Sequence, residues 1–304
     1  MTRPANAART QTSPATILLN RASGSGRATT AADRVEALLQ SAGIDAPVLT
    51  VDGRHVAAAA EQAVAAGSSI LVAGGGDGTV STVAAVATRA GVTLGILPLG
   101  TLNHFARDVG IPSELEAAID VITHGRPLPV DVGDVNGHLF LNNSSLGLYP
   151  RMVWEREQEQ QRGRRKWPAL AVATFRVWRQ YRRIAVTVDG NGSRRIVRTP
   201  FVFIGNNEYT LDGGRIDNRE RLDAGVLQLC VAPGVDRMGM LRIVAAALAG
   251  RLDAVDAFES QLLTEVTIGG RSARLGVSLD GEMTTLASPL RYRIRRRALR
   301  VLVP

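Results

Sequence analysis

The sequence predicts a two-domain α/β protein: a doubly wound N-terminal domain followed by a C-terminal domain that is mostly an antiparallel β-sandwich. From residue 15 to 133, short apolar runs alternate with stretches of helical length, which is typical of a parallel sheet. From residue 134 to 304, short apolar runs follow one another with turn residues between them, which favours antiparallel strands. A chain of 304 residues, 45% of them apolar, is long enough to bury two cores.

The first domain is expected to contain four strands with helices between them. The expected strands are 16–20, 47–51, 69–73 and 93–97, and the expected helices are 31–42, 55–66 and 80–90. Gly43 and Gly67 end the first two helices, because glycine readily adopts the left-handed conformation of a helix C-terminus. Ligands of such sheets bind beyond the carboxyl ends of the strands. We therefore expect three loops to meet at one edge: 20–26, 74–79 and 98–103.

The second domain is expected to contain short strands and two helices. The expected strands are 138–142, 184–188, 195–204, 226–231, 263–268, 275–279 and 290–295, and the expected helices are 155–182 and 237–250. We leave open that the last strand packs back on the first domain. Residues 1–14 lack the apolar run of a signal peptide and predict a disordered tail. No stretch reaches the ~18–20 apolar residues of a membrane span.

The run Gly74-Gly75-Gly76-Asp77-Gly78-Thr79 is the strongest functional signal. Glycines between a strand and a helix let the backbone approach a ligand, and the free N–H groups of a helix N-terminus attract anions. Asp77 would repel a bare phosphate, so its presence indicates that a divalent cation accompanies the phosphate. The only lysine is Lys166, which excludes a Gly-x-x-x-x-Gly-Lys site. The run therefore predicts a nucleotide–metal site.

The net charge of +8 is concentrated in residues 151–183, which hold ten Lys/Arg and three Glu. All three tryptophans lie there, and Trp167, Trp178 and Arg179 are expected to contact lipid, because tryptophan and cations suit an interfacial helix. The alternative is a helix packed on the β domain with a solvated arginine face. No nucleic-acid motif accompanies the charge, so no nucleic-acid partner is expected. A single cysteine, Cys230, gives no disulfide framework and fits a reducing compartment.

Three motifs in order resemble the catalytic domain of diacylglycerol kinases, which bacterial soluble lipid kinases and sphingosine kinases share and to which NAD kinases are distantly related. They are the run 75–79, the run 98–103 and Leu279-Asp280-Gly281-Glu282. The opening Asn20-x-x-Ser23-Gly24 also matches, with Arg21 in place of proline. The resemblance implies a NAD kinase-like α/β domain and a β-sandwich domain, with ATP and Mg²⁺ in the cleft between them.

The resemblance also implies roles for individual residues. Asp77 would hold the metal, and Asp280 would be the general base that takes the proton of the acceptor hydroxyl. Asp131 matches another acidic position of the active site, and Glu282 would orient the metal or the base. Asp280-Gly281 is equally the sequence of a tight hairpin turn. The implied ATP-binding residues are Asn20, Ser23, Gly24, Gly75, Gly76, Asp77, Gly78, Thr79, Gly100, Thr101 and Asn103.

Two positions depart from the family pattern. His104 stands where the family often has aspartate, and Ala224 stands where relatives bind a structural Mg²⁺, with Asp223 one residue out of register. The expected function is an ATP-dependent lipid kinase that phosphorylates diacylglycerol or a related lipid alcohol at an anionic membrane surface. It would be cytoplasmic and peripherally membrane-associated, and a homodimer is left open. The alternatives are a kinase of a soluble small molecule, as in NAD kinases, and a non-catalytic nucleotide- or lipid-binding protein.

Overall fold

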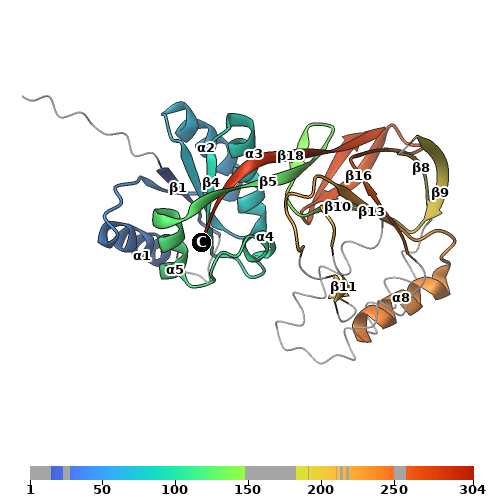
Figure 1. Cartoon of the computed structure of the whole chain (residues 1–304), viewed down its shortest axis with the longest axis horizontal. Coiled ribbons are helices and arrows are strands. Elements are labelled where there is room, and N and C mark those ends of the chain that lie inside the picture. Colours follow the sequence, from blue (N-terminus) through green and yellow to red (C-terminus); the bar gives the residue numbers. More distant parts are fainter. Residues whose placement is uncertain are drawn as a thin grey trace, which may run out of the picture.

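The computed structural model describes residues 15–22, 28–147, 183–190, 192–209, 211–212, 215–216, 219–249 and 258–304. Figure 1 shows an α/β part and a β part side by side, joined by two long strands. The parallel sheet of the first part and the antiparallel strands of the second confirm the predicted fold class. The expected tail 1–14, the expected helix 155–182 and the residues Trp167, Trp178 and Arg179 lie outside the described residues.

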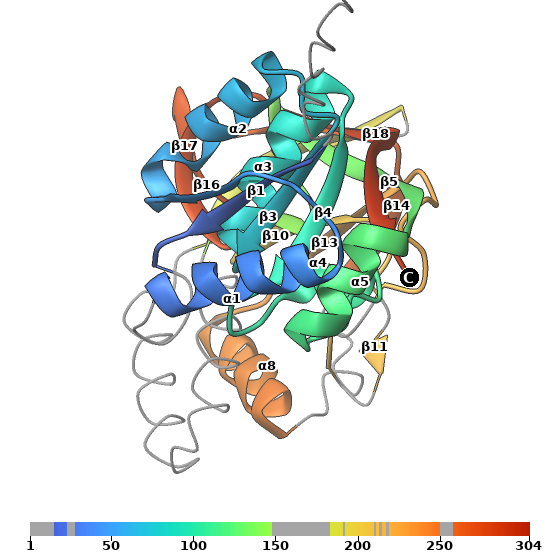
Figure 2. The ribbon, with the colours of Figure 1, turned by 90° about the vertical axis from the view of Figure 1, so that its left-hand side faces the viewer.

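Four parallel strands and their crossover helices build the first domain. The strands are β1 (Ala15–Asn20), β2 (Val48–Val51), β3 (Ile70–Gly75) and β4 (Thr93–Pro98), in the order β2-β1-β3-β4. The helices are α1 (Ala28–Ser41), the short 3₁₀ turn η1 (Gly53–His55), α2 (Val56–Ala65), α3 (Asp77–Ala90), α4 (His104–Asp108) and α5 (Leu115–His124). Helices α2 and α3 cover one face of the sheet, and α1 and α5 cover the other (Figure 2).

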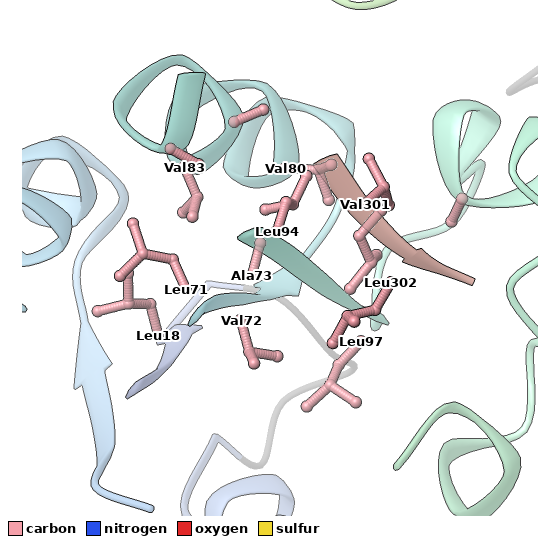
Figure 3. Packing of buried hydrophobic residues seen from close by; sticks show 14 of the residues in the cluster. Leu18, Leu71, Val72, Ala73, Val80, Val83, Leu94, Leu97, Val301 and Leu302 are labelled. Atoms are coloured by element: carbon pink, nitrogen blue, oxygen red, sulfur yellow. The ribbon is translucent and has the colours of Figure 1, made fainter. Parts of the chain in front are cut away.

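The core of this domain explains why its strands read as unbroken apolar runs. Strands of a parallel sheet are covered on both faces, so consecutive residues such as Leu71 and Val72 are both fully buried. Figure 3 shows Val80 and Val83 of α3 above the sheet, against side chains of neighbouring strands. This packing fixes α3 on the sheet, and with it the loop that precedes the helix.

Two long strands connect the domains. Strand β18 (Leu290–Val303) pairs with β4 in parallel and with β5 (Arg126–Val135) in antiparallel fashion, and its first half pairs with β15 (Glu265–Gly269). The expected strand 290–295 therefore continues eight residues further, to Val303, because the apolar residues after it are buried in the first core. One ten-stranded sheet thus runs through both domains (Figure 1).

The second domain is a sandwich of two antiparallel layers. One layer is the six-stranded sheet β14 (Glu259–Leu263), β13 (Leu227–Val231), β10 (Phe201–Asn206), β7 (Asn143–Gly147), β16 (Arg274–Leu279) and β17 (Glu282–Ala287). The other is the end of the long sheet, with β6 (His138–Phe140), β8 (Ile184–Gly190), β9 (Ser193–Thr199) and β15. Apolar residues of both layers form the second core. The domain also contains α8 (Arg237–Ala249) and the small pair β11 (Leu211–Asp212) and β12 (Arg215–Ile216).

Two expected strands of this domain are wrong in their extent. The stretch 195–204 is two strands, β9 and β10, which separate at Pro200, a residue without an N–H to donate to a sheet. The stretch 263–268 is likewise shared between β14 and β15, which belong to different sheets. Among the described helices, none combines the length and apolarity needed to cross a bilayer.

Candidate functional site

A cleft of about 580 Å³ lies where the carboxyl ends of the parallel strands face the β16–β17 hairpin. Its lining comes from loops of the first domain and from one turn of the second: Asn20, Ala22, Gly53, Arg54, Gly76, Asp77, Gly78, Thr79, Thr82, Thr101, Leu102, Asp280, Gly281 and Glu282. The three loops expected at one edge and the distant Asp280 turn therefore share one cleft. Ser23 and Gly24 lie outside the described residues.

The end of the glycine run, from Asp77, forms the first turn of α3, and Gly74 and Gly75 end β3. The helix begins at Asp77, three residues before the expected start, and its first hydrogen bond joins the Val80 N–H to the Gly76 carbonyl. The N–H groups of the residues between them have no partner within the helix. A helix N-terminus with free donors and a positive dipole end is a binding site for anions. The start of α3 therefore gives the cleft a place for phosphate.

Glycine is required where the loops touch. A Cβ atom on Gly100 would lie 2.4 Å from the Cα of Gly76, and one on Gly75 would lie 2.6 Å from the Thr79 hydroxyl. Real Cβ atoms do not approach other atoms so closely, so side chains here would push the loops apart. Gly75 and Gly100 are not among the lining residues, and they shape the cleft by allowing this approach.

The side chains of two asparagines hold the loops in place through hydrogen bonds. The Asn20 amide donates to the Thr79 hydroxyl at 2.8 Å, and its oxygen accepts from the Ala22 N–H at 3.1 Å. The Asn103 amide bonds only its own loop: it accepts from the Gly100 N–H and donates to the Gly100 carbonyl. Asn103 is absent from the lining, whereas Asn20 and Thr101 belong to it. Asn103 thus braces the loop on which Thr101 faces the cleft.

Asp77 lies in the first turn of α3 and lines the cleft. Its carboxylate accepts a long hydrogen bond of 3.4 Å from the Phe105 N–H, so most of its acceptor capacity is available. Within the described residues, no group of three or more His, Cys, Asp or Glu could hold a metal by itself. Mg²⁺ commonly uses one or two carboxylates together with waters and substrate phosphates, and Asp77 fits that arrangement. By contrast, the Asp223 carboxylate is occupied by Arg221 and Arg297.

Asp280 occupies a two-residue hairpin turn. Leu279 pairs with Glu282 across the hairpin, and both turn residues have positive φ, 46° at Asp280 and 91° at Gly281. These are the signs of a type I′ turn, for which Asp-Gly is well suited. The turn and the cleft residue, which the sequence offers as alternatives, are therefore the same feature.

The Asp280 carboxylate accepts four hydrogen bonds. One oxygen accepts from the Asn142 and Asn143 N–H groups at 2.7 and 3.1 Å. The other accepts from the Leu141 N–H at 2.8 Å and from the Ser81 hydroxyl at 2.6 Å. Burial raises the pKa of the Asp280 carboxyl above its ordinary value, and the four hydrogen bonds oppose that rise. The group is thus a carboxylate with a perturbed pKa at the wall of a cleft, the usual situation of an acid–base residue.

Glu282 lies two residues after Asp280, and its side chain reaches the other domain. A Cβ atom on Gly78 would lie only 2.5 Å from a Glu282 carboxylate oxygen, so the glutamate lies against the first turn of α3. Its side chain is exposed and lines the cleft. Asp77, Asp280 and Glu282 therefore bring three carboxylates to one cleft, where Arg54 is the only cationic residue among the described lining.

Asp131 is not among the residues that line this cleft, and its expected active-site role stays a prediction. Its side chain is buried, and its two oxygens accept from the N–H groups of Gly225 and Arg297 at 2.6 and 2.7 Å. Arg297 has a φ of 48° and lies in the register shift between Arg295 and Leu299, where β18 passes between the domains. Asp131 thus ties the bulge of β18 at Arg297 to the backbone at Gly225, because its two oxygens accept from both buried N–H groups.

Sequence reasoning missed Arg54, Ser81 and Arg219. Arg219 is fully buried: its guanidinium binds the Asp108 carboxylate at 2.6 Å and donates to the Leu141 carbonyl. It also donates to the Asn206 carbonyl and the Asn142 amide oxygen, and it lies over the rings of Phe105 and Tyr209. Burial raises the pKa of the Tyr209 hydroxyl to about 12, which keeps it neutral. No sequence signal marks Arg219, which lies among other charged residues.

Comparison with known families gives two adjoining matches. Residues 14–135 match the model of the diacylglycerol kinase catalytic domain. Residues 152–303 match the model of the YegS C-terminal NAD kinase beta sandwich-like domain. The two matches together span both domains described above.

Individual relatives agree with this result. A protein of Pseudomonas putida named "Probable lipid kinase YegS-like" is 30% identical over 80% of this chain and 80% of its own length. One of the same name from Pseudomonas aeruginosa is 50% identical, over 29% of this chain and 30% of its own length. The crystal structure of a diacylglycerol kinase from Bacillus anthracis str. Sterne has a TM-score of 0.70 at 19% identity and covers 97% of this chain and 98% of its own. That structural likeness concerns the fold.

Proposed function

The chain belongs to the diacylglycerol kinase-like family of lipid kinases, and from this premise we propose that it transfers the γ-phosphoryl group of ATP to the hydroxyl of diacylglycerol or a related lipid alcohol. One observation carries the proposal: the anion-binding start of α3 and the Asp280 carboxylate face each other in one cleft. Phosphoryl transfer needs the donor phosphate and the base that serves the acceptor in one site.

The first domain would hold the nucleotide. The N–H groups at the start of α3 would bind the phosphates, and Asn20, Gly76 and Thr101 would complete the walls of the nucleotide site. Asp77 would hold the Mg²⁺ that accompanies ATP. When bound, that ion neutralises charge on the phosphate oxygens. Arg54 would add positive charge to a cleft whose other charged lining residues are carboxylates.

The second domain would serve the acceptor. Asp280 would take the proton of the acceptor hydroxyl while that oxygen attacks the γ-phosphorus. Three backbone N–H groups fix the orientation of its carboxylate, so little reorganisation is needed at the moment of reaction. Glu282 would keep the hairpin against α3 and so hold the two halves of the site together.

A lipid acceptor is supported by the family rather than by a lipid-binding surface on the described residues. The relatives are named as lipid kinases. The segment with Trp167, Trp178 and Arg179 has the composition of an interfacial helix and would bring the protein to an anionic membrane surface. We therefore propose that the protein binds peripherally to a membrane and that its lipid substrate enters the cleft from that membrane.

A transfer assay with labelled ATP tests the proposal. The acceptors are diacylglycerol, monoacylglycerol, a sphingoid base, ceramide and phosphatidylglycerol in mixed micelles, and NAD in solution. Labelled phospholipid from at least one lipid alcohol, dependent on Mg²⁺, is the expected result. Turnover of NAD alone would show a soluble-substrate kinase, and nucleotide binding without transfer to any acceptor would show a non-catalytic protein. Either outcome contradicts the proposal.

A further inference from the structure

We propose that the Ser81 hydroxyl fills one hydrogen-bonding position on the Asp280 carboxylate until the hydroxyl of the lipid substrate replaces it. Ser81 thereby keeps water from using Asp280 as a base. The inference rests on the proposed function, because it takes Asp280 as the base of phosphoryl transfer. Ser81 lies on α3, one turn after the phosphate-binding start of the helix, and its bond to Asp280 crosses from one domain to the other.

The hydrogen bonds of the Asp280 carboxylate fill its acceptor positions. A carboxylate offers about four acceptor positions, two on each oxygen. All four are filled here, by the N–H groups of residues 141–143 and by the Ser81 hydroxyl. A carboxylate in this state has no position left for the hydroxyl of a substrate. One of the four donors must leave before Asp280 can accept a proton.

Ser81 is the donor that can leave at the smallest cost. The three N–H groups belong to the backbone of Leu141 and Asn142, which precede β7, and of Asn143, its first residue. Asn143 is held by pairing with β10, and the Asn142 carbonyl accepts from the Asn206 N–H, so moving this backbone would break those contacts. The Ser81 hydroxyl needs only a rotation about its side-chain bond, and in this position it is replaced by a group of the same kind. An alcohol hydroxyl on the substrate would make the same 2.6 Å type of hydrogen bond to the same oxygen.

Once the substrate hydroxyl has replaced Ser81, we expect the following transfer. The acceptor oxygen forms a bond to the γ-phosphorus, the bond from that phosphorus to the bridging oxygen of ADP breaks, and the acceptor proton goes to the Asp280 oxygen that Ser81 has left. Water could follow the same course and would give ADP and inorganic phosphate. A lipid bound in the cleft can displace Ser81 with the help of its other contacts, whereas a single water molecule has no such binding energy.

Three variants test this role. Ser81→Ala removes the hydroxyl and leaves its acceptor position on Asp280 open to water, and Ser81→Thr keeps the hydroxyl. Thr88→Val is the matched control, because Thr88 lies on the same helix and its hydroxyl is bonded within the helix, to the Ala84 carbonyl. The measurement is release of inorganic phosphate from MgATP without any acceptor, together with phosphorylation of diacylglycerol in mixed micelles.

We expect Ser81→Ala to hydrolyse ATP at least about tenfold faster than the wild type, since access to a general base typically gives larger factors than this. Ser81→Thr, which keeps the hydroxyl, should hydrolyse ATP more slowly than Ser81→Ala, and the control Thr88→Val should hydrolyse ATP at the wild-type rate. Unchanged hydrolysis in Ser81→Ala would overturn the inference, as would equal hydrolysis in Ser81→Ala and Ser81→Thr.

A failure of the proposed function gives a different pattern. In that case the wild type phosphorylates no alcohol of the panel, while hydrolysis by the Ser81 variants still reports on Asp280. The double variant Ser81→Ala/Asp280→Asn completes the test: the extra hydrolysis must disappear when the base is removed. Extra hydrolysis that persists in the double variant would show that water does not use Asp280.

Discussion

Replacing Arg219 by methionine tests whether the buried ion pair fixes the domain interface. Methionine keeps much of the apolar stem and removes the guanidinium, which makes five hydrogen bonds, two of them to Asp108. The side chain is 0% exposed and that of Asp108 only 7%, so the aspartate would remain as a buried charge without its partner. Removing one partner of a buried pair costs about 3–5 kcal/mol.

The expected loss is large enough to measure by thermal and urea denaturation. For a large domain each kcal/mol lowers the melting temperature by about 2–4 °C, so a loss of about 3–5 kcal/mol should make Arg219→Met melt about 6–20 °C below the wild type. Phosphoryl transfer should also slow at temperatures where the variant is folded, because Arg219 holds the Leu141 carbonyl and the Asn142 side chain, whose backbones hold Asp280.

A double-mutant cycle with Asp108→Leu separates the ion pair from general damage. Because an apolar pair can replace a buried ion pair at little cost, Arg219→Met/Asp108→Leu should be more stable than Arg219→Met alone. Asp134→Asn is the control, because it alters a buried carboxylate that pairs with Arg293 and is not in the cleft. An Arg219→Met variant within about 1 kcal/mol of the wild type would refute the reasoning, because a broken buried pair costs more than that.

Three further predictions concern single residues. Gly100→Ala should weaken ADP binding by about tenfold, since overpacking costs about 1–3 kcal/mol and the added Cβ would lie 2.4 Å from the Cα of Gly76. The control Gly276→Ala, where the added Cβ meets open space, should bind ADP normally in calorimetry. Equal ADP affinities of the two variants would contradict this prediction. Asp131→Ala should lower the free energy of unfolding in urea by about 3 kcal/mol, because two buried N–H groups lose their acceptor, and a loss under about 1 kcal/mol would oppose the junction role. Because burial raises the pKa of Asp280, kcat/KM should fall with decreasing pH at a midpoint above the ordinary value of about 3.9; a midpoint below that value would count against Asp280 as base.

Much of the fold follows from periodicity in the sequence. The strands of the first domain are unbroken apolar runs, and α3 ends at Gly91, whose left-handed φ of 69° is a normal helix C-terminus. The expected start of α3 was wrong because glycine has low helix propensity. The helix nevertheless begins at Asp77, where the loop contacts hold it. Helix α5 was missed although Ala118, Ile119 and Ile122 have helical spacing.

The site could be predicted only as far as its motifs reach. Asp77 and Asp280 could be identified because each lies in a distinctive glycine-containing run. Ser81, Arg219 and the backbone contacts of Asp131 could not, because they depend on partners far away in the sequence: Ser81 and Asp280 are 199 residues apart, and Asp108 and Arg219 are 111 apart. Such contacts arise from the long β18 and β5 strands that bring the domains together, a pairing that no local pattern specifies.

The most direct test of the central claim is transfer of labelled γ-phosphate from ATP to diacylglycerol by Asp280→Asn, with ADP affinity measured on the same preparation. An amide has no carboxylate to accept the proton, whereas the proposed nucleotide contacts lie in the other domain. We expect unchanged ADP affinity and a transfer rate at least about 100-fold below that of the wild type. Transfer by Asp280→Asn at a rate close to that of the wild type would contradict it.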